Sequence, residues 1–116
     1  MKEVVGSSFS LLHLAAMYNR PGFVHLLIKH GLDVNQRGGE MGMTPLHEAV
    51  RTGNFEAALG LLDRGADLEA KIKDTSSRRA YTPLEFAILS PSRAPKILSL
   101  FLERGAKYGH TTQSKP

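Results

Sequence analysis

The chain of 116 residues contains no cysteine. A disulfide, a thiolate nucleophile and a zinc site with cysteine ligands are therefore all excluded. Long apolar runs are absent too, since none approaches the roughly 20 residues that a membrane-spanning helix requires. The first six residues also lack the apolar stretch of a secretory signal. These absences predict a soluble domain of the cytoplasm.

Catalytic and metal-binding motifs are missing as well. The sequence has no G-x-S-x-G turn, no phosphate-binding Gly-Lys-Ser/Thr loop and no G-x-G-x-x-G after a strand. Gly38–Gly42 is rich in glycine, but it lies in a predicted loop and opens no helix. His25 and His30 are five residues apart, which is not the i, i+4 spacing of a metal-binding pair on a helix. We expect no catalysis, no cofactor and no metal.

What the sequence does contain is an internal repeat. Three segments align with one another and begin 34 and 38 residues apart: Ser10–Ala16, Thr44–Val50 and Thr82–Ile88. A second set keeps the same register: Leu26–Gly31, Gly60–Gly65 and Leu100–Gly105. Units of this length cannot bury their apolar faces alone, so we expect them to stack.

The second unit predicts two short helices followed by a loop. Thr44 can cap the first helix, and Pro45 suits its first position, where a missing N–H is harmless. Gly53 ends that helix, and Asn54 can cap the next one. Gly65 then closes the second helix in the left-handed region of backbone conformation.

These residues resemble the ankyrin-repeat family, whose repeats open with T-P-L-H and close with G-A-D-V-N. The matching segments are Thr44–His47 and Gly65–Ala70 in repeat two, His13–Ala16 and Gly31–Asn35 in repeat one, and Thr82–Leu84 and Gly105–Lys107 in repeat three. Repeat one has Ser10-Leu11 in place of Thr-Pro, and repeat three has Glu85 in place of the histidine. The resemblance implies an all-α ankyrin-repeat solenoid of three helix-turn-helix repeats with hairpin-like finger loops.

The resemblance also implies a division of the chain. We expect one domain over residues 1–109, with repeats at about 8–39, 40–77 and 78–109 and a flexible tail at 110–116. Asp74–Arg79 holds a four-residue insertion, and the turn Pro91–Pro95 is two residues longer than its counterpart. Such insertions either lie on the binding face or reflect neutral drift in an exposed loop. No polar caps stand at the ends, so we expect both ends to fray or to be covered by a partner.

Further roles follow from the resemblance. It makes His13 and His47 structural, each hydrogen-bonding the neighbouring backbone and the Ser or Thr that opens its repeat. It also implies a concave binding surface built from the finger loops and from the late positions of each first helix. The helix positions are Met17, Tyr18, Arg51, Thr52, Leu89 and Ser90. The finger positions are Arg37, Glu40, Met41, Met43, Lys71, Arg78, Arg79 and Tyr81.

Residue type narrows this set. Met, Tyr and Arg are enriched in the cores of protein interfaces, and Tyr and Arg contribute disproportionately to binding energy. Tyr18 and Tyr81 are therefore the expected anchors. Alternatively, Met41 or Met43 packs beneath its finger and contacts no partner.

The net charge of +4 is unevenly distributed along the chain. Residues 1–70 hold six basic and eight acidic residues, whereas residues 71–116 hold nine basic and three acidic ones. The basic half favours a protein partner with an acidic surface. A nucleic acid or an anionic membrane is the alternative, although no nucleic-acid-binding motif is present and aromatic residues are few.

Together these patterns predict a non-catalytic module that is monomeric when free and binds another protein. An inhibitor, an adaptor, a toxin-neutralising protein and a secreted effector all fit this prediction. The alternative is polyanion binding by the basic C-terminal half.

Overall fold

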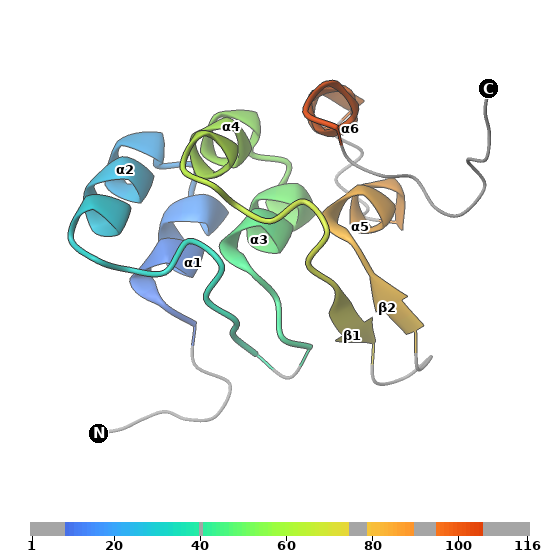
Figure 1. Ribbon diagram of the computed structural model, residues 1–116, viewed down its shortest axis with the longest axis horizontal. Helices are drawn as coiled ribbons and strands as arrows, with labels where there is room; N and C mark the ends of the chain where they lie inside the picture. Colours follow the sequence, from blue (N-terminus) through green and yellow to red (C-terminus); the bar gives the residue numbers. More distant parts are fainter. Residues whose placement is uncertain (1–8, 40, 75–78, 90–94, 106–116) are drawn as a thin grey trace.

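The computed structural model describes residues 9–39, 41–74, 79–89 and 95–105 (Figure 1). Within these ranges the chain forms six short helices and one pair of strands. The elements are α1 (Leu11–Met17), α2 (Pro21–Lys29), α3 (Pro45–Thr52), α4 (Phe55–Asp63), β1 (Ile72–Asp74), β2 (Arg79–Tyr81), α5 (Pro83–Leu89) and α6 (Pro95–Glu103). We refer to the helix pairs α1–α2, α3–α4 and α5–α6 as repeats one, two and three.

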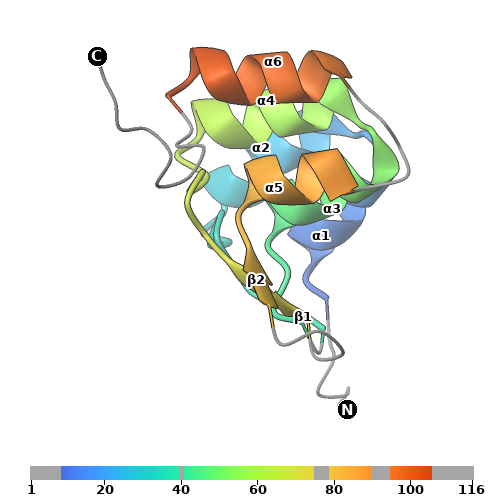
Figure 2. The ribbon, with the colours of Figure 1, turned by 90° about the vertical axis from the view of Figure 1, so that its right-hand side faces the viewer.

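The helices form two layers, which the two perpendicular views separate (Figures 1 and 2). The first helix of each pair lies in the inner layer, where α3 packs between α1 and α5. The second helix lies in the outer layer, where α4 packs between α2 and α6. The predicted all-α solenoid of three stacked helix pairs is confirmed.

Sequence signals at the helix ends act as predicted in the inner layer. The Thr44 hydroxyl accepts the backbone N–H of His47, and Pro45 is the first residue of α3. Ser10 caps α1 in the same way, and the histidine three residues later completes both capping boxes. Gly53 ends α3 at φ 74°, in the left-handed region that glycine enters without steric cost.

Asn54 differs from its predicted role. Its side chain makes no capping hydrogen bond to α4. Instead, Asn54 Nδ2 donates to the carbonyl oxygens of Ala16 and Met17, at 2.8 Å each. Those carbonyls end α1. The carbonyl of Ala16 also accepts the backbone N–H of Asn19 at 3.3 Å, and a side chain from the next repeat supplies both carbonyls with a donor. Asn54 therefore joins repeat two to repeat one.

A continuous apolar core runs through the stack between the two layers. Its fully buried members come from all three repeats: Leu12, Ala16, Val24, Leu46, Ala49, Val50, Ala57, Ala58, Leu61, Ile97 and Phe101. Gly60 of α4 faces α2. A Cβ atom added to Gly60 would make ordinary van der Waals contact, at 3.8 Å, with side-chain atoms of both Pro21 and Val24.

Two fingers project from the inner layer (Figure 2). In the first, Gly38 and Met43 exchange two backbone hydrogen bonds of 2.9 Å across a turn in which Gly39 and Gly42 have positive φ. In the second, β1 and β2 are antiparallel, with Ile72 opposite Tyr81. The predicted hairpin-like fingers are thus present. Parts of the two insertions, residues 75–78 and 91–94, lie outside the described residues, as does the expected tail at 110–116.

Replacing Asn54 with Ala should lower the free energy of unfolding by about 1–2 kcal/mol, because two partly buried carbonyls of α1 lose a side-chain donor. Chemical denaturation followed by circular dichroism measures this loss. Gln36→Ala, at an exposed loop position, is the matched control. An Asn54→Ala variant as stable as this control would show that the contact between the repeats carries no stability.

Candidate protein-binding surface

His13 links α1 of the inner layer to the first finger. Its Nδ1 accepts the backbone N–H of Ser10 at 3.0 Å, so the ring proton lies on Nε2. Nε2 then donates to the carbonyl oxygen of Met43 at 2.7 Å. Because Met43 ends the first finger, one buried imidazole connects α1 to the finger that precedes α3. The predicted structural role of His13 is confirmed.

His47 makes the same capping contacts at the start of α3. Its Nδ1 lies 2.8 Å from the Thr44 hydroxyl and accepts the Thr44 backbone N–H at 3.3 Å. Its Nε2 has no hydrogen-bond partner of good geometry among the described residues. Backbone groups of Tyr81 and Ala70 are nevertheless close enough to favour the charged imidazolium slightly. Burial outweighs that effect and lowers the pKa of His47 to about 4.

Burial acts on His13 in the same direction. It lowers the pKa of His13 below 6.5, against the opposing effects of the hydrogen bond to Met43 and the charge of Glu48. Both imidazoles are therefore neutral at pH 7. A neutral, hydrogen-bonded and fully buried histidine is suited to a structural role and not to general acid–base catalysis.

Glu85 takes the histidine position in repeat three. Its carboxylate accepts the backbone N–H of Thr82 at 3.0 Å, while the Thr82 hydroxyl accepts the N–H of Glu85 at 3.2 Å. This pair caps α5 as the histidines cap α1 and α3. A carboxylate has no proton to donate onward at neutral pH, so Glu85 cannot form the link to a next finger that His13 makes.

The first finger contributes fewer exposed side chains than predicted. Met43 is only 7% exposed, which agrees with the alternative that it packs beneath the finger. Met41 is half-buried, and Glu40 lies outside the described residues. Arg37 is exposed, and its Nη1 donates to the carbonyl of Gly42 at 3.0 Å and to that of Lys71. Arg37 therefore spans the two fingers.

The ends of the first helices differ from one another. Arg51 is partly exposed, but its Nε and Nη2 donate to one oxygen of the buried Glu48 carboxylate, at 2.9 and 2.8 Å. The Thr52 hydroxyl donates to the carbonyl of Glu48 at 2.7 Å and accepts from Asn54. Both side chains therefore hydrogen-bond within repeat two. Met17, at the end of α1, is half-buried.

Repeat three brings several predicted residues together. Arg79, Tyr81 and Leu89 line one depression between β2 and α5. Sequence reasoning missed three further lining residues: Ala80, Glu85 and Ile88. Lys71 is exposed beside β1, whereas Arg78 and Ser90 lie outside the described residues. We call the depression lined by Arg79–Tyr81, Glu85, Ile88 and Leu89 the β2–α5 depression.

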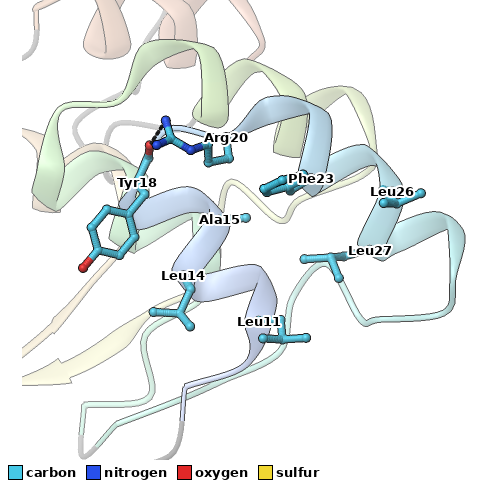
Figure 3. Close-up of a pocket in the computed structure, with 8 residues that line it drawn as sticks. All are labelled: Leu11, Leu14, Ala15, Tyr18, Arg20, Phe23, Leu26 and Leu27. Carbon is cyan, nitrogen blue, oxygen red and sulfur yellow. Dashed lines mark hydrogen bonds between the residues drawn. The ribbon is translucent and has the colours of Figure 1, made fainter.

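Tyr18 lies elsewhere. It belongs to an apolar groove of about 400 Å³ between α1 and α2, on the side of repeat one that faces away from repeat two (Figure 3). The groove is lined by Leu11, Leu14, Ala15, Tyr18, Arg20, Phe23, Leu26 and Leu27. Tyr18 and Tyr81 therefore do not share one depression. The sequence does contain a signal for this groove. Leu14, Phe23 and Leu26 are large and apolar, whereas the equivalent residues of repeat two, Glu48, Ala57 and Gly60, are charged or small.

Two further searches cover only the part of the chain that the structure describes. No group of three or more His, Asp or Glu side chains there could hold a metal ion. No helix in that part is long and apolar enough to cross a membrane.

Stacked helix pairs with projecting fingers define a helical repeat protein. The family model of ankyrin repeats (3 copies) matches residues 5–72, and the chain belongs to the ankyrin-repeat family. Ankyrin repeats typically mediate protein–protein interaction and are generally not enzymes.

Individual relatives are much longer than this chain. It is 36% identical over 97 residues to the NF-kappa-B inhibitor cactus of Drosophila melanogaster, an alignment of 83% of this chain and 18% of that protein. It is 35% identical over 107 residues to BTB/POZ domain-containing protein 1 of Schizosaccharomyces pombe, covering 89% of this chain and 8% of that one. It is 47% identical over 58 residues to human palmitoyltransferase ZDHHC13, covering 50% and 9%. The chain thus spans less than a fifth of the length of each.

Acid should destabilise the fold through the buried histidines. The unfolded chain takes up a proton at His47 below its ordinary pKa of 6.5, whereas the folded chain does not until about pH 4. Protonation of His47 therefore leaves the free energy of unfolding unchanged well above pH 6.5 and lowers it as the pH falls from 6.5 toward 4. At pH 5 the loss from His47 alone is about 2 kcal/mol.

Denaturant titrations at pH 7 and pH 5 measure this loss. His47→Gln should lose less stability between the two pH values than the wild type does, whatever its stability at pH 7. His30→Gln is the matched control, because His30 is exposed. Equal losses in the wild type and in His47→Gln would contradict the role of burial.

Proposed function

We propose that the chain binds another protein through its concave face and acts as an inhibitor by masking the surface that it covers. The main support is the β2–α5 depression, where the exposed side chains of Arg79, Ile88 and Leu89 lie together with the half-buried Tyr81. Such a mixture is typical of an interface core, in which large apolar side chains supply contact area and arginine supplies directional hydrogen bonds. Catalysis and a cofactor form no part of this proposal.

The side chains along the concave face are held in place, which supports its role as the binding surface. The side chains of Arg37, Arg51 and Thr52 are held by hydrogen bonds within the stack, and His13 fixes the first finger to α1. A preorganised surface loses little conformational entropy on binding. Inhibition is the role named for the relative cactus, whose alignment covers most of this chain. Adaptor, toxin-neutralising and effector roles use the same contact and differ only in the partner.

The partner that we propose has an acidic surface. Residues 71–116 carry nine basic and three acidic residues, and Lys71 and Arg79 are exposed on the second finger. Arg104 adds little, since its guanidinium pairs with Asp63 at 2.9 Å. The cytoplasm is the compartment that we propose. The other predicted contact residues, Met17, Glu40, Met41, Arg78 and Ser90 among them, remain candidates for contact with the partner.

Tyr81→Ala tests the position of the binding surface. The wild-type chain is used as bait in an extract of its source cell, and the affinity of the stoichiometric partner is then measured for the variants. Tyr81→Ala should weaken binding at least about tenfold, because an aromatic anchor loses its contact area. Tyr18→Ala is the matched variant, since that ring is exposed in the groove on repeat one. Loss of the partner through Tyr18→Ala alone would refute the concave face.

Arg79→Glu tests the charge of the partner. Reversing this exposed charge should slow association most at low ionic strength and have little effect at high salt, because exposed charges are screened. Stopped-flow measurements at several salt concentrations separate the association and dissociation rates. A polyanion ligand would instead give a steep salt dependence with little preference among DNA, RNA and anionic vesicles. That outcome would replace the protein partner by the second candidate function, polyanion binding by residues 71–116.

A further inference from the structure

Repeat one carries an apolar groove that lies outside the β2–α5 depression. Its walls are α1 and α2, and all of its lining residues come from these two helices and the turn between them (Figure 3). Contiguous exposed apolar surface of this kind marks a binding site. We call it the repeat-one groove, and its walls include Leu11, Leu14, Tyr18, Arg20, Phe23 and Leu26.

The spacing of the wall residues suits a helix. On α1, Leu11, Leu14 and Tyr18 follow one another at i, i+3 and i+7, and on α2 Phe23 and Leu26 are three residues apart. Residues with this spacing lie along one side of a helix, so each wall is a stripe parallel to its helix axis. Walls of seven and nine helical residues are roughly 10–14 Å long. That length matches roughly two turns of a third helix.

Helices cover the equivalent side of the other two repeats. Ala57 of repeat two and Ile97 of repeat three stand where repeat one has Phe23, and both are fully buried. Leu100, at the position of Leu26, is 6% exposed. These residues lie where α4 packs on α2 and where α6 packs on α4. The repeat-one groove is therefore on the side of a repeat that receives helices.

The polarity of the groove favours a helix over an extended peptide. Among the eight residues that line it, only Tyr18 and Arg20 have polar side chains, and the backbone groups of both walls are used within the helices. An extended segment would leave its own backbone N–H and C=O groups without partners against such walls. A helix satisfies those groups internally and presents only side chains.

The open shape of the groove favours a macromolecule over a small ligand. Sites for small molecules enclose most of the surface of their ligand. Here the walls remain open, since Leu14 is 43% exposed and Phe23 is 58% exposed. A helix of a larger protein needs only one of its faces to be covered.

A cationic side chain lies at one end of the groove. Arg20 is exposed, and its Nη1 donates to the carbonyl oxygen of Tyr18 at 3.1 Å, which holds the guanidinium at the rim (Figure 3). A guanidinium carries five N–H donors, so donors remain for a carboxylate. Residues 9–39 hold three basic residues and one acidic residue, and none of the residues that line the groove is acidic. An acidic flank on the bound helix complements this charge.

We propose that the repeat-one groove binds an amphipathic helix of a partner protein, with the apolar stripe of that helix between α1 and α2 and an acidic residue on its flank against Arg20. Recognition of a helix in a groove depends on apolar anchors at i, i+3, i+4 and i+7. The site goes beyond the proposed function, since it shares no residue with the β2–α5 depression.

Three fluorescent peptides test the proposal with the intact chain. The first is an alanine-based helix of about 20 residues, with Leu at i, i+3, i+4 and i+7 and Glu beside this stripe. The second has Lys in place of each Glu, and the third has the composition of the first in an order without the stripe. Fluorescence anisotropy should show saturable binding of the first peptide, binding of the second that is at least about tenfold weaker, and no binding of the third.

Matched variants then locate the bound peptide. Phe23→Ala removes an aromatic ring from the groove and should weaken binding at least about tenfold, whereas Tyr81→Ala removes a ring from the β2–α5 depression and should have no effect. Arg20→Glu should make the chain prefer the Lys peptide. Arg79→Glu makes the same change of charge in the β2–α5 depression and should keep the preference for the Glu peptide. Circular dichroism checks that each variant folds.

Each other outcome overturns the proposal. Equal binding of the third peptide would show that the apolar surface does not select a helix, and equal affinity for the Glu and Lys peptides would refute the acidic flank. A peptide lost through Tyr81→Ala but not through Phe23→Ala would lie on the concave face. Self-association of the wild type that Phe23→Ala abolishes and the first peptide does not reverse would assign the groove to a second copy.

Failure of all three peptides to bind would also refute the proposal. It would leave unchanged the effect of Tyr81→Ala on the partner of the concave face, so the two proposals can fail separately.

Discussion

A pair of helices of seven to nine residues cannot bury an apolar face by itself, and the whole structure depends on this constraint. The apolar core of the protein therefore lies between repeats as much as within them. Val24 and Ala58 are fully buried in the outer layer, where Gly60 of α4 faces Pro21 and Val24 of α2. Asn54 and His13 add polar links that cross from one repeat to the next. Shape and stability come from the stack and not from any single helix pair.

The same constraint determines which surfaces are left for binding. Stacking uses the two broad sides of each repeat, so the fingers and the ends of the inner helices are free along the concave edge. Glu85 caps α5 but cannot donate a hydrogen bond onward as His13 does to the first finger. The concave edge is therefore the surface that stacking leaves for a partner.

Local signals made the fold predictable from the sequence. Thr44, Pro45 and Gly53 act at helix ends, where a residue's own backbone preference decides the structure. The candidate site was harder to predict because exposure depends on neighbours. The same rule predicts a helix cap at Asn54, yet its side chain donates to the carbonyls that end α1. Position within the repeat predicts Tyr18 on the concave face, but Tyr18 lines an apolar groove together with Phe23 and Leu26. That groove depends on how α1 and α2 pack, which the position of Tyr18 in the repeat does not show.

Amide hydrogen exchange tests most directly whether stacking governs this molecule. Opening free energies vary across a structure with the contacts that each segment makes. We expect the slowest exchange in α3 and α4, because each packs against a helix on both sides. Exchange in α1, α2, α5 and α6 should be faster. Terminal helices as protected as α3 and α4 would contradict the account.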